Sequence, residues 1–419
     1  YLPILAIICL SMLVIGTDGG FISVILPDMA SDLGTDTGTI SWVIVANGMT
    51  LGGLILLFGK MSSKGYLREV VVYGAVVTGV FSLVCYFATD VTTMIVARAL
   101  NGVGCAMIAA ASAVLVAKRL PEDMLAMGFG VSILGTSIGY LAGPVFGGIL
   151  TEMTSWAACF LTIVPMCVAI VLLALRTLNR EEKDRSELDV TGGLLFMVSI
   201  SAGIYVLERW AYPEERLINL AMVAVFFITM AAFIVLELRL KAPMINVRIF
   251  RNGRFTLAMV SVLLFYMSCL GLVYILPFFM QVNLGLSATM IGVYIMLQSA
   301  VSMVFTIPVS AMADKHGTRR YSIIGGLVLL AGFLIMMVGS WMTDTLIVVI
   351  GICMAGLSWA FCGSALDSRP VETVEGDSRE MASSVVYMAS CFGSTLGTAI
   401  FALSFTAFTG SWNVDFDVL

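Results

Sequence analysis

The sequence predicts an all-α protein whose chain crosses a lipid bilayer many times. Hydrophobic residues make up 60% of its 419 residues and charged residues only 12%, whereas roughly 25% of the residues in a soluble domain are charged. Apolar runs of about 18 or more residues recur along the whole length, and a membrane-spanning helix needs such a run. These runs do not alternate polar with apolar residues, so they predict helices rather than the strands of a barrel.

The apolar runs follow one another with only short polar stretches between them, which leaves no room for a soluble domain. Each run is long enough for one membrane-spanning helix. We therefore expect thirteen spans, at about residues 2–27, 38–59, 69–88, 91–117, 124–150, 155–175, 188–207, 217–238, 256–281, 288–312, 321–341, 345–366 and 381–408.

The positions of the basic residues predict the orientation of these spans. If the N-terminus lies in the cytoplasm, every one of the 22 basic residues except Arg98, Arg209 and Arg216 falls in a cytoplasmic loop. Cytoplasmic loops of membrane proteins carry such an excess of lysine and arginine. We therefore expect a multi-pass protein of the cell (plasma) membrane with a cytoplasmic N-terminus.

Two similar loops indicate an internal repeat. Residues 59–68 read GKMSSKGYLR and residues 310–320 read SAMADKHGTRR, and eight spans separate the two loops. The simplest account is two six-helix halves with two additional helices between them. This account predicts an N-terminal bundle over 1–176, a linker with two extra helices over 177–254, and a C-terminal bundle over 255–419. Only five spans of the last bundle are visible, so we expect a fourteenth beyond residue 419.

Two charges stand inside apolar runs. Asp18 lies within the first span and Arg98 within the fourth. A charged side chain at the centre of a bilayer costs roughly 2.5–3.5 kcal/mol, and such residues commonly serve as proton relays or ion pairs. Asp18 is the only acid that we expect at the depth of Arg98, so the sequence predicts a pair. The pair is interpreted as a proton-coupling switch or as a purely structural contact.

The fifth span carries glycines on one face. Gly135, Gly139, Gly143 and Gly147 are four residues apart, and Pro144 bends the helix between them. Small residues in this pattern let two helices approach closely. One interpretation is ordinary tight packing, and the other is a smooth contact between the two halves, where they rock against each other.

Polar and aromatic residues at mid-depth are candidates for a solute-binding cavity between the halves. Each of them also suits ordinary helix packing. The candidates are Asn47, Tyr266, Tyr274, Tyr294, Gln298, Trp359 and Tyr387.

The composition argues against an enzyme and against an ATP-driven pump. The chain has one histidine, no C-x-x-C pair among its nine cysteines, no H-E-x-x-H motif and no phosphate-binding glycine loop. We expect no metal, no catalytic residues and no cofactor other than protons as coupling ions. The expected partners are a small-molecule substrate and the lipid bilayer, with no nucleic acid.

Several motifs resemble the major facilitator superfamily and, within it, the fourteen-helix drug:proton antiporter family. DGGFISVILP at 18–27 resembles the first-helix motif with its aspartate, and RALNGVG at 98–104 resembles the arginine motif, with Asn101 where the family usually has glutamine. LDVTGG at 188–193 and PMINVRIFRNGRF at 243–255 resemble the segments that flank the two extra helices. The matches to the antiporter motif of span five are Gly130, Gly139, Gly143, Pro144, Gly147 and Gly148. The matches to the cytoplasmic loop motif are Asp314, Gly317, Arg319 and Arg320.

The resemblance implies a major facilitator fold, a monomer, and proton-coupled efflux of amphipathic or cationic small molecules by alternating access. Asp18 and Arg98 would then couple protons to transport. The first loop departs from the family pattern, because Ser63 stands where the family has an acid. The alternative is a proton-coupled importer or uniporter of a small metabolite on the same fold.

Overall fold

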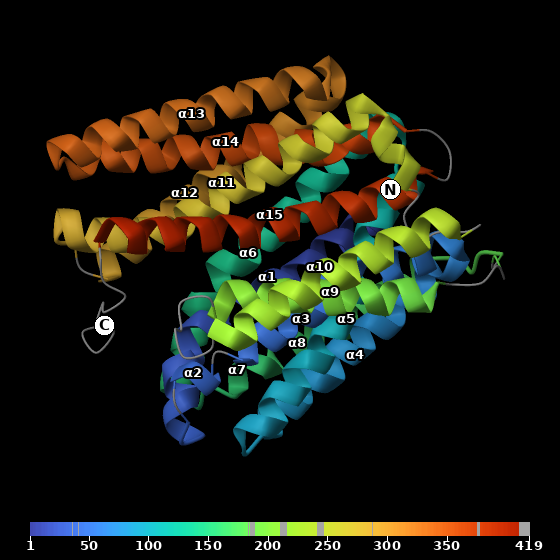
Figure 1. Ribbon diagram of the computed structural model, residues 1–419, viewed down its shortest axis with the longest axis horizontal. Helices are drawn as coiled ribbons and strands as arrows, with labels where there is room; N and C mark the ends of the chain where they lie inside the picture. Colours follow the sequence, from blue (N-terminus) through green and yellow to red (C-terminus); the bar gives the residue numbers. More distant parts are fainter. Residues whose placement is uncertain are drawn as a thin grey trace.

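The computed structural model describes residues 1–419 except 36, 41, 183, 185–188, 210–215, 241–246, 287, 375–377 and 410–419. Some further side chains inside helices, including that of Tyr274, also lie outside the description. The described part of the chain is helical throughout, with short turns between helices (Figure 1). The predicted fold class, an all-α polytopic membrane protein, is therefore confirmed.

Each predicted span corresponds to a long helix. By length and composition, ten stretches of the described helices can cross a membrane, and one of them, Trp42–Phe87, contains two of the predicted spans. The long helices are α1 (Leu2–Asp32), α3 (Trp42–Met61), α4 (Leu67–Phe87), α5 (Val91–Arg119), α6 (Leu125–Met153), α8 (Ile163–Thr177), α9 (Val190–Arg209), α10 (Arg216–Arg239), α11 (Gly253–Leu284), α12 (Ala288–His316), α13 (Thr318–Met342), α14 (Thr345–Glu372) and α15 (Ser378–Thr409).

Short elements connect some of these helices. The α2 turn (Thr37–Ile40) precedes α3, and α7 (Ala158–Leu161) precedes α8 within the sixth predicted span. A π-helical turn (Ser62–Tyr66) joins α3 to α4, and its Gly65 has a φ of +88°, a left-handed conformation that favours glycine. Two 3₁₀ turns, Glu122–Met124 and Val247–Arg251, precede α6 and α11.

The helix α14 extends well beyond the span that the apolar pattern predicts. The twelfth span was expected to end near residue 366, but α14 continues to Glu372. The last turns of α14 contain Asp367 and Ser368, which are buried among other helices. An apolar run identifies the part of a helix that is surrounded by lipid. It does not identify polar turns of the same helix that are surrounded by protein.

The helices form two groups that meet along a central seam. In Figure 1 the helices from α11 to α15, coloured yellow to red, lie on one side, and α3, α4, α5 and α8 lie on the other. The first group consists of α1 and α3 to α8; in it, α1 packs on α6, and α3 and α4 pack on α5. The second group consists of α11 to α15; in it, α13 packs on α14 and α11 packs on α15. The groups meet where α6 contacts α12 and α14, and where α15 contacts α3 and α5. The additional helices attach at the side, with α9 on α3 and α10 on α9.

The glycine face of α6 packs mainly on α1. A Cβ at Gly139 would overlap the backbone of Gly16 and Thr17, and a Cβ at Gly143 would lie 2.8 Å from the backbone nitrogen of Phe21. The interpretation of this face as a contact between the two halves is therefore wrong for these positions, because α1 and α6 belong to the same group. The alternative interpretation, tight packing, describes them.

Other members of the span-five motif have different surroundings. Gly130 faces the second group, where a Cβ would lie 2.9 Å from Cβ of Ser310 on α12. Gly147 also packs on α1, since a Cβ at this position would lie 2.9 Å from Cβ of Phe21. A Cβ at Gly148 would meet no atom within 4 Å. Pro144 lies inside α6, next to Gly20 of α1.

Candidate functional site

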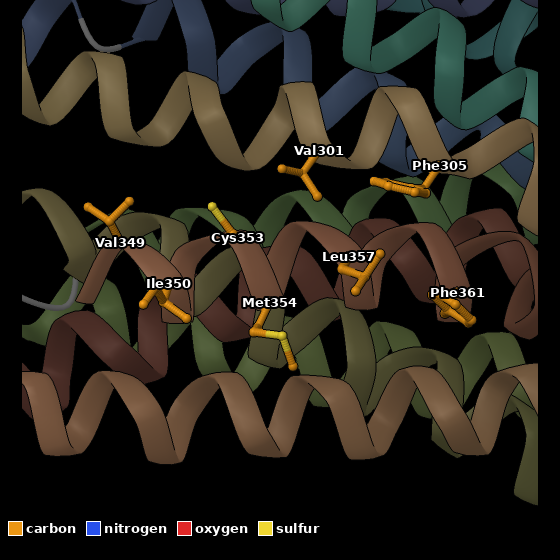
Figure 2. Close-up of a pocket in the computed structure, with 8 residues that line it drawn as sticks. All are labelled: Val301, Phe305, Val349, Ile350, Cys353, Met354, Leu357 and Phe361. Carbon is orange, nitrogen blue, oxygen red and sulfur yellow. The ribbon is translucent and has the colours of Figure 1, made fainter. Parts of the chain in front are cut away.

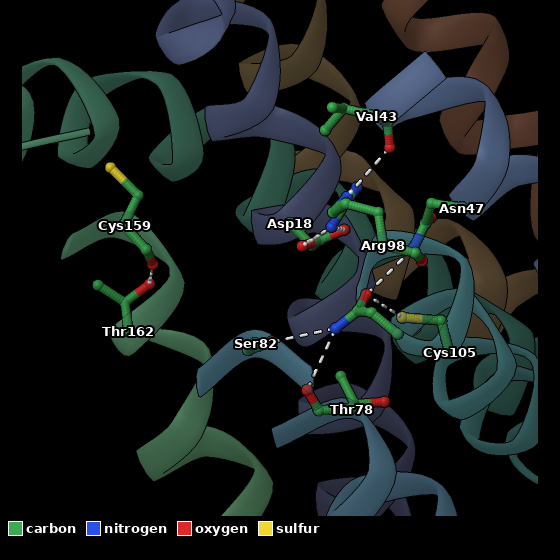
Figure 3. Close-up of polar contacts among 10 residues, drawn as sticks. Asp18, Val43, Asn47, Thr78, Ser82, Arg98, Cys105, Cys159 and Thr162 are labelled. Atoms are coloured by element: carbon green, nitrogen blue, oxygen red, sulfur yellow. Dashed lines mark hydrogen bonds and ion pairs between the residues drawn. The ribbon is translucent and has the colours of Figure 1, made fainter. Parts of the chain in front are cut away.

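Asp18 and Arg98 form an ion pair in the interior of the first helix group. Nη1 of Arg98 donates hydrogen bonds to Oδ1 and Oδ2 of Asp18 at 2.7 and 2.8 Å (Figure 3). The exposed fractions are 4% for Asp18 and 2% for Arg98, so neither charge reaches solvent. The ion pair joins α1 to α5. This confirms the pairing that the sequence predicted from two charges within apolar runs.

The rest of the guanidinium contacts the protein on two further sides. Nε of Arg98 donates to the carbonyl oxygen of Val43 on α3 at 3.2 Å. The ring of Phe160 lies 5.8 Å from the guanidinium carbon, within the range of a cation–π contact. Arg98 therefore retains a carbonyl and an aromatic partner that do not depend on the charge of Asp18.

Two asparagines extend this polar network away from the ion pair. Nδ2 of Asn47 donates to the backbone oxygen of Arg98 at 3.3 Å and to Oδ1 of Asn101 at 3.0 Å. Nδ2 of Asn101 donates to the carbonyl oxygen of Thr78 and to Oγ of Ser82, both at 3.1 Å (Figure 3). Asn47, predicted as a cavity residue, therefore belongs to the helix-joining network.

A cavity of about 930 Å³ lies between the two helix groups. This volume is near the upper end of the roughly 300–1,000 Å³ that small-molecule pockets occupy. Its walls come from both groups and from the additional helices, and they are mostly apolar, with Tyr140 of α6 among the polar residues. The cavity therefore has the size and the lining to hold an amphipathic molecule.

The structure places four of the seven predicted cavity residues in this wall: Tyr266, Gln298, Trp359 and Tyr387. Tyr294 lies on α12, half-buried, and is not among the lining residues. The side chain of Tyr274 lies outside the described residues. Asp18 and Arg98 are also absent from the described wall.

The cavity wall holds a carboxylate that the sequence reading missed. Asp367 of α14 lines the cavity and is only 7% exposed. Its Oδ2 accepts a hydrogen bond from the Tyr266 hydroxyl at 2.8 Å, whereas its Oδ1 is buried without a hydrogen-bond partner. The sequence analysis did not single out Asp367, because the twelfth span was expected to end near residue 366. A signal was present, since Trp359, Gly363 and Asp367 are four residues apart and share one helix face.

Polar contacts join the two helix groups at the end of the bundle that carries the loop motifs. Oδ1 and Oδ2 of Asp314 on α12 accept from the backbone N–H groups of Ala126 and Met127 at the start of α6, both at 2.9 Å. Gly317 adopts a φ of +95° between α12 and α13, and Arg319 and Arg320 are exposed. A carboxylate at a helix N-terminus is electrostatically favourable, so Asp314 holds α6 against α12.

Charge pairs also join the two helix groups at this end, close to Ser63. Nζ of Lys118 on α5 lies 3.5 Å from Oε1 of Glu380 on α15 and also donates to the backbone oxygen of Ser63 at 3.3 Å. Nη2 of Arg379 lies 2.8 Å from Oε1 of Glu122. This end of the seam is therefore closed by contacts from both groups.

A second hollow lies between α12 and α14. It has a volume of about 480 Å³, and every one of its lining side chains is apolar or a cysteine (Figure 2). Several of these side chains, such as Phe305 and Ile350, are exposed on the surface of the bundle. A polar solute has no partner in this groove, and lipid tails are the expected neighbours.

Metal chemistry finds no support in the described residues. They contain no group of three or more His, Cys, Asp or Glu side chains that could hold a metal ion. The described features are instead the buried ion pair of Asp18 and Arg98, the carboxylate of Asp367 in the cavity wall, and the polar contacts that join the two helix groups at one end.

Comparison with known proteins agrees with this architecture. The chain matches the family model described as "Major Facilitator Superfamily" over residues 8–398. It is 24% identical to the multidrug resistance protein Stp of Mycobacterium tuberculosis, over 93% of this chain and 73% of Stp. It is 25% identical to the riboflavin transporter RibZ of Clostridioides difficile, over 76% of this chain and 69% of RibZ.

A solved structure shares the fold. The human organic anion transporter MFSD10 superposes with a TM-score of 0.72 at 14% sequence identity, covering 97% of this chain and 94% of MFSD10. At this identity the likeness concerns the fold alone. Because the family model covers almost the whole chain, the protein is a multi-pass membrane transporter that belongs to the Major Facilitator Superfamily.

Proposed function

We propose that the protein is a proton-coupled exporter of amphipathic or cationic small molecules that works by alternating access. The observation that carries the proposal is the buried pair of Asp18 and Arg98 beside a largely apolar cavity of about 930 Å³ between two helix groups. The likeness to the multidrug resistance protein Stp supports export over import.

The coupling step in this proposal is competition for Asp18. In the paired state Arg98 occupies both carboxylate oxygens. A proton that binds Asp18 removes the negative charge, so the hydrogen bonds to Arg98 lose their charge-assisted strength. Arg98 keeps Val43 and Phe160 as partners, and the link between α1 and α5 weakens. Protonation would thus change the relative stability of two conformations, as coupling requires.

Alternating access needs a seam that closes at one end at a time. With the N-terminus in the cytoplasm, the end held by Asp314, Lys118 and Arg379 faces the cytoplasm. The described conformation is then the one closed toward the cytoplasm. The proposal places the protein in the cell membrane as a monomer, with residues 1–176 and 255–419 as the two moving bundles and 177–254 as the inserted segment.

The test uses purified protein in liposomes that contain a pH-sensitive dye. A pH gradient is imposed, a lipophilic cation such as ethidium is added, and wild type is compared with Asp18→Asn. We expect ethidium-dependent proton movement in the wild type and none in the variant, because asparagine cannot take up the proton. Proton movement that is unchanged in the variant would remove Asp18 from the coupling step, and its absence in the wild type would refute proton-coupled export.

A second candidate is a proton-coupled importer or uniporter of a small metabolite. The observation that favours it is the likeness to the riboflavin transporter RibZ, which is as strong in identity as the likeness to Stp. The same liposomes discriminate the two. A proton-coupled importer moves its solute in the same direction as protons, whereas a uniporter equilibrates its solute without proton movement.

A further inference from the structure

We propose that Asp367, together with Tyr266 and Trp359, forms a binding site for the cationic group of an organic monocation, such as a quaternary ammonium or a protonated amine. The site lies in the wall of the central cavity, on the helix group opposite to Asp18. The inference rests on the proposed function, since it names the group that receives the charge of the exported molecule.

The hydrogen-bonding state of Asp367 is the first observation. Its Oδ2 is held by the Tyr266 hydroxyl at 2.8 Å, so the carboxylate has a fixed orientation. Its Oδ1 is buried and has no hydrogen-bond partner. A buried acceptor without a partner is costly, and a carboxylate without a counter-charge is more so. A cationic ligand in the cavity would supply the missing partner.

The charges around Asp367 are the second observation. The described titratable groups on which the charge of Asp367 acts are uncharged thiols and phenols: Cys362 on its own helix, Tyr266 on α11, and Tyr387 and Cys391 on α15. No salt bridge to Asp367 occurs among the described residues. Arg369, the nearest cation in the sequence, acts on Glu372 instead. A cationic ligand in the cavity would therefore be the counter-charge of Asp367.

The aromatic residues beside Asp367 are the third observation. The rings of Tyr266 and Trp359 have centroids 5.5 Å apart and meet edge to face, and the ring of Phe265 lies 5.6 Å from that of Trp359. Tyr266 and Trp359 both line the cavity. Aromatic faces attract organic cations, most strongly where the cation is desolvated. A carboxylate next to such rings suits a cation that carries apolar substituents.

Asp18 does not offer a comparable site. Arg98 occupies both of its oxygens, and neither residue lines the described cavity. Asp18 and Asp367 therefore have separate tasks: Asp18 releases Arg98 when it takes up a proton, and Asp367 binds the positive charge of the substrate. This division also explains why the described wall, which is mostly apolar, contains a carboxylate.

Equilibrium binding to the purified protein tests the site without any transport step. The probes are ethidium and phenanthridine, which share a fused ring system and differ in charge in mildly alkaline buffer. We expect Asp367→Asn to weaken ethidium binding by roughly 10- to 100-fold, as the loss of a contact to a charged group implies. Phenanthridine binding should not change, because asparagine keeps the shape of the side chain and an acceptor for Tyr266.

Two further variants keep the test specific. Asp367→Glu retains the charge and should keep more ethidium affinity than Asp367→Asn. Asp28→Asn makes the same chemical change at an exposed position of α1 and should leave both probes unaffected. Ethidium binding that is unchanged in Asp367→Asn would overturn the inference. So would an equal loss for both probes, or a wild type that binds no ethidium.

The outcome is separable from that of the liposome test. A wild type that binds ethidium through Asp367 but moves no protons would refute proton coupling and leave the site in place. If the wild type exchanges protons for ethidium and Asp367→Asn binds ethidium with full affinity, the site is refuted and proton coupling stands.

Discussion

The buried pair of Asp18 and Arg98 predicts a large and non-additive effect on stability. Asp18→Asn removes the charge that faces Nη1 of Arg98 and leaves the guanidinium with the carbonyl of Val43 at 3.2 Å and the Phe160 ring. Because Arg98 is only 2% exposed, water cannot replace the lost carboxylate. Removing one partner of a buried ion pair costs about 3–5 kcal/mol of unfolding free energy, and we expect a loss in this range.

The double variant shows whether the loss comes from the unpaired charge. Arg98→Met leaves Asp18 without its partner, and the double variant Asp18→Asn/Arg98→Met contains neither charge. Apolar or neutral replacements of a whole buried pair are often tolerated. We expect the double variant to be more stable than the sum of the single effects by about 1–3 kcal/mol, the usual coupling of residues in contact.

Unfolding in mixed micelles, titrated with a denaturing detergent, measures these free energies for each variant. Asp28→Asn serves as the control, because it makes the same change at an exposed position of the same helix and should leave the unfolding free energy unaltered. Strictly additive effects of the two single variants would refute the reasoning, since they would mean that the two charges do not stabilise each other. A loss in Asp28→Asn as large as in Asp18→Asn would also refute it.

Two other contacts give predictions about packing. Gly139→Ala should reduce the yield of monodisperse protein in size-exclusion chromatography, because the new Cβ overlaps the backbone of α1, whereas Gly148→Ala should behave like wild type, because no atom lies within 4 Å. Asp314→Ala should lower the unfolding free energy by about 0.5–2 kcal/mol, the usual value of a lost helix cap, since two N–H groups of α6 lose their acceptor. The exposed Asp28 of α1, changed to alanine, is its control, and equal losses in both would contradict the assigned role.

The sequence was sufficient for the fold and for the ion pair. Apolar runs are long enough to identify helices without knowledge of their neighbours, because lipid forces each helix to satisfy its own backbone. Asp18 and Arg98 were found for the same reason, since each charge interrupts an apolar run and must have a partner.

The sequence was insufficient where a residue's neighbours decide its role. Spacing of four predicted that the glycines of α6 pack closely, but it could not say that α1 is the partner. Asn47 was interpreted as a cavity residue because it is polar at mid-depth, yet it turns to Asn101 and the backbone of α5. Asp367 was missed because the apolar run ends before it, although the helix and its protein surroundings continue.

The network around Arg98 has a mechanical consequence. One guanidinium and one asparagine amide tie α1, α3, α4 and α5 together at mid-depth. In the second group, hydrogen bonds join α14 to α11 through Tyr266, to α12 through Ser364 and to α13 through Ser358. We therefore expect each helix group to turn as one stiff block, so that the cavity adjusts to molecules of different shapes by movement along the seam between the groups.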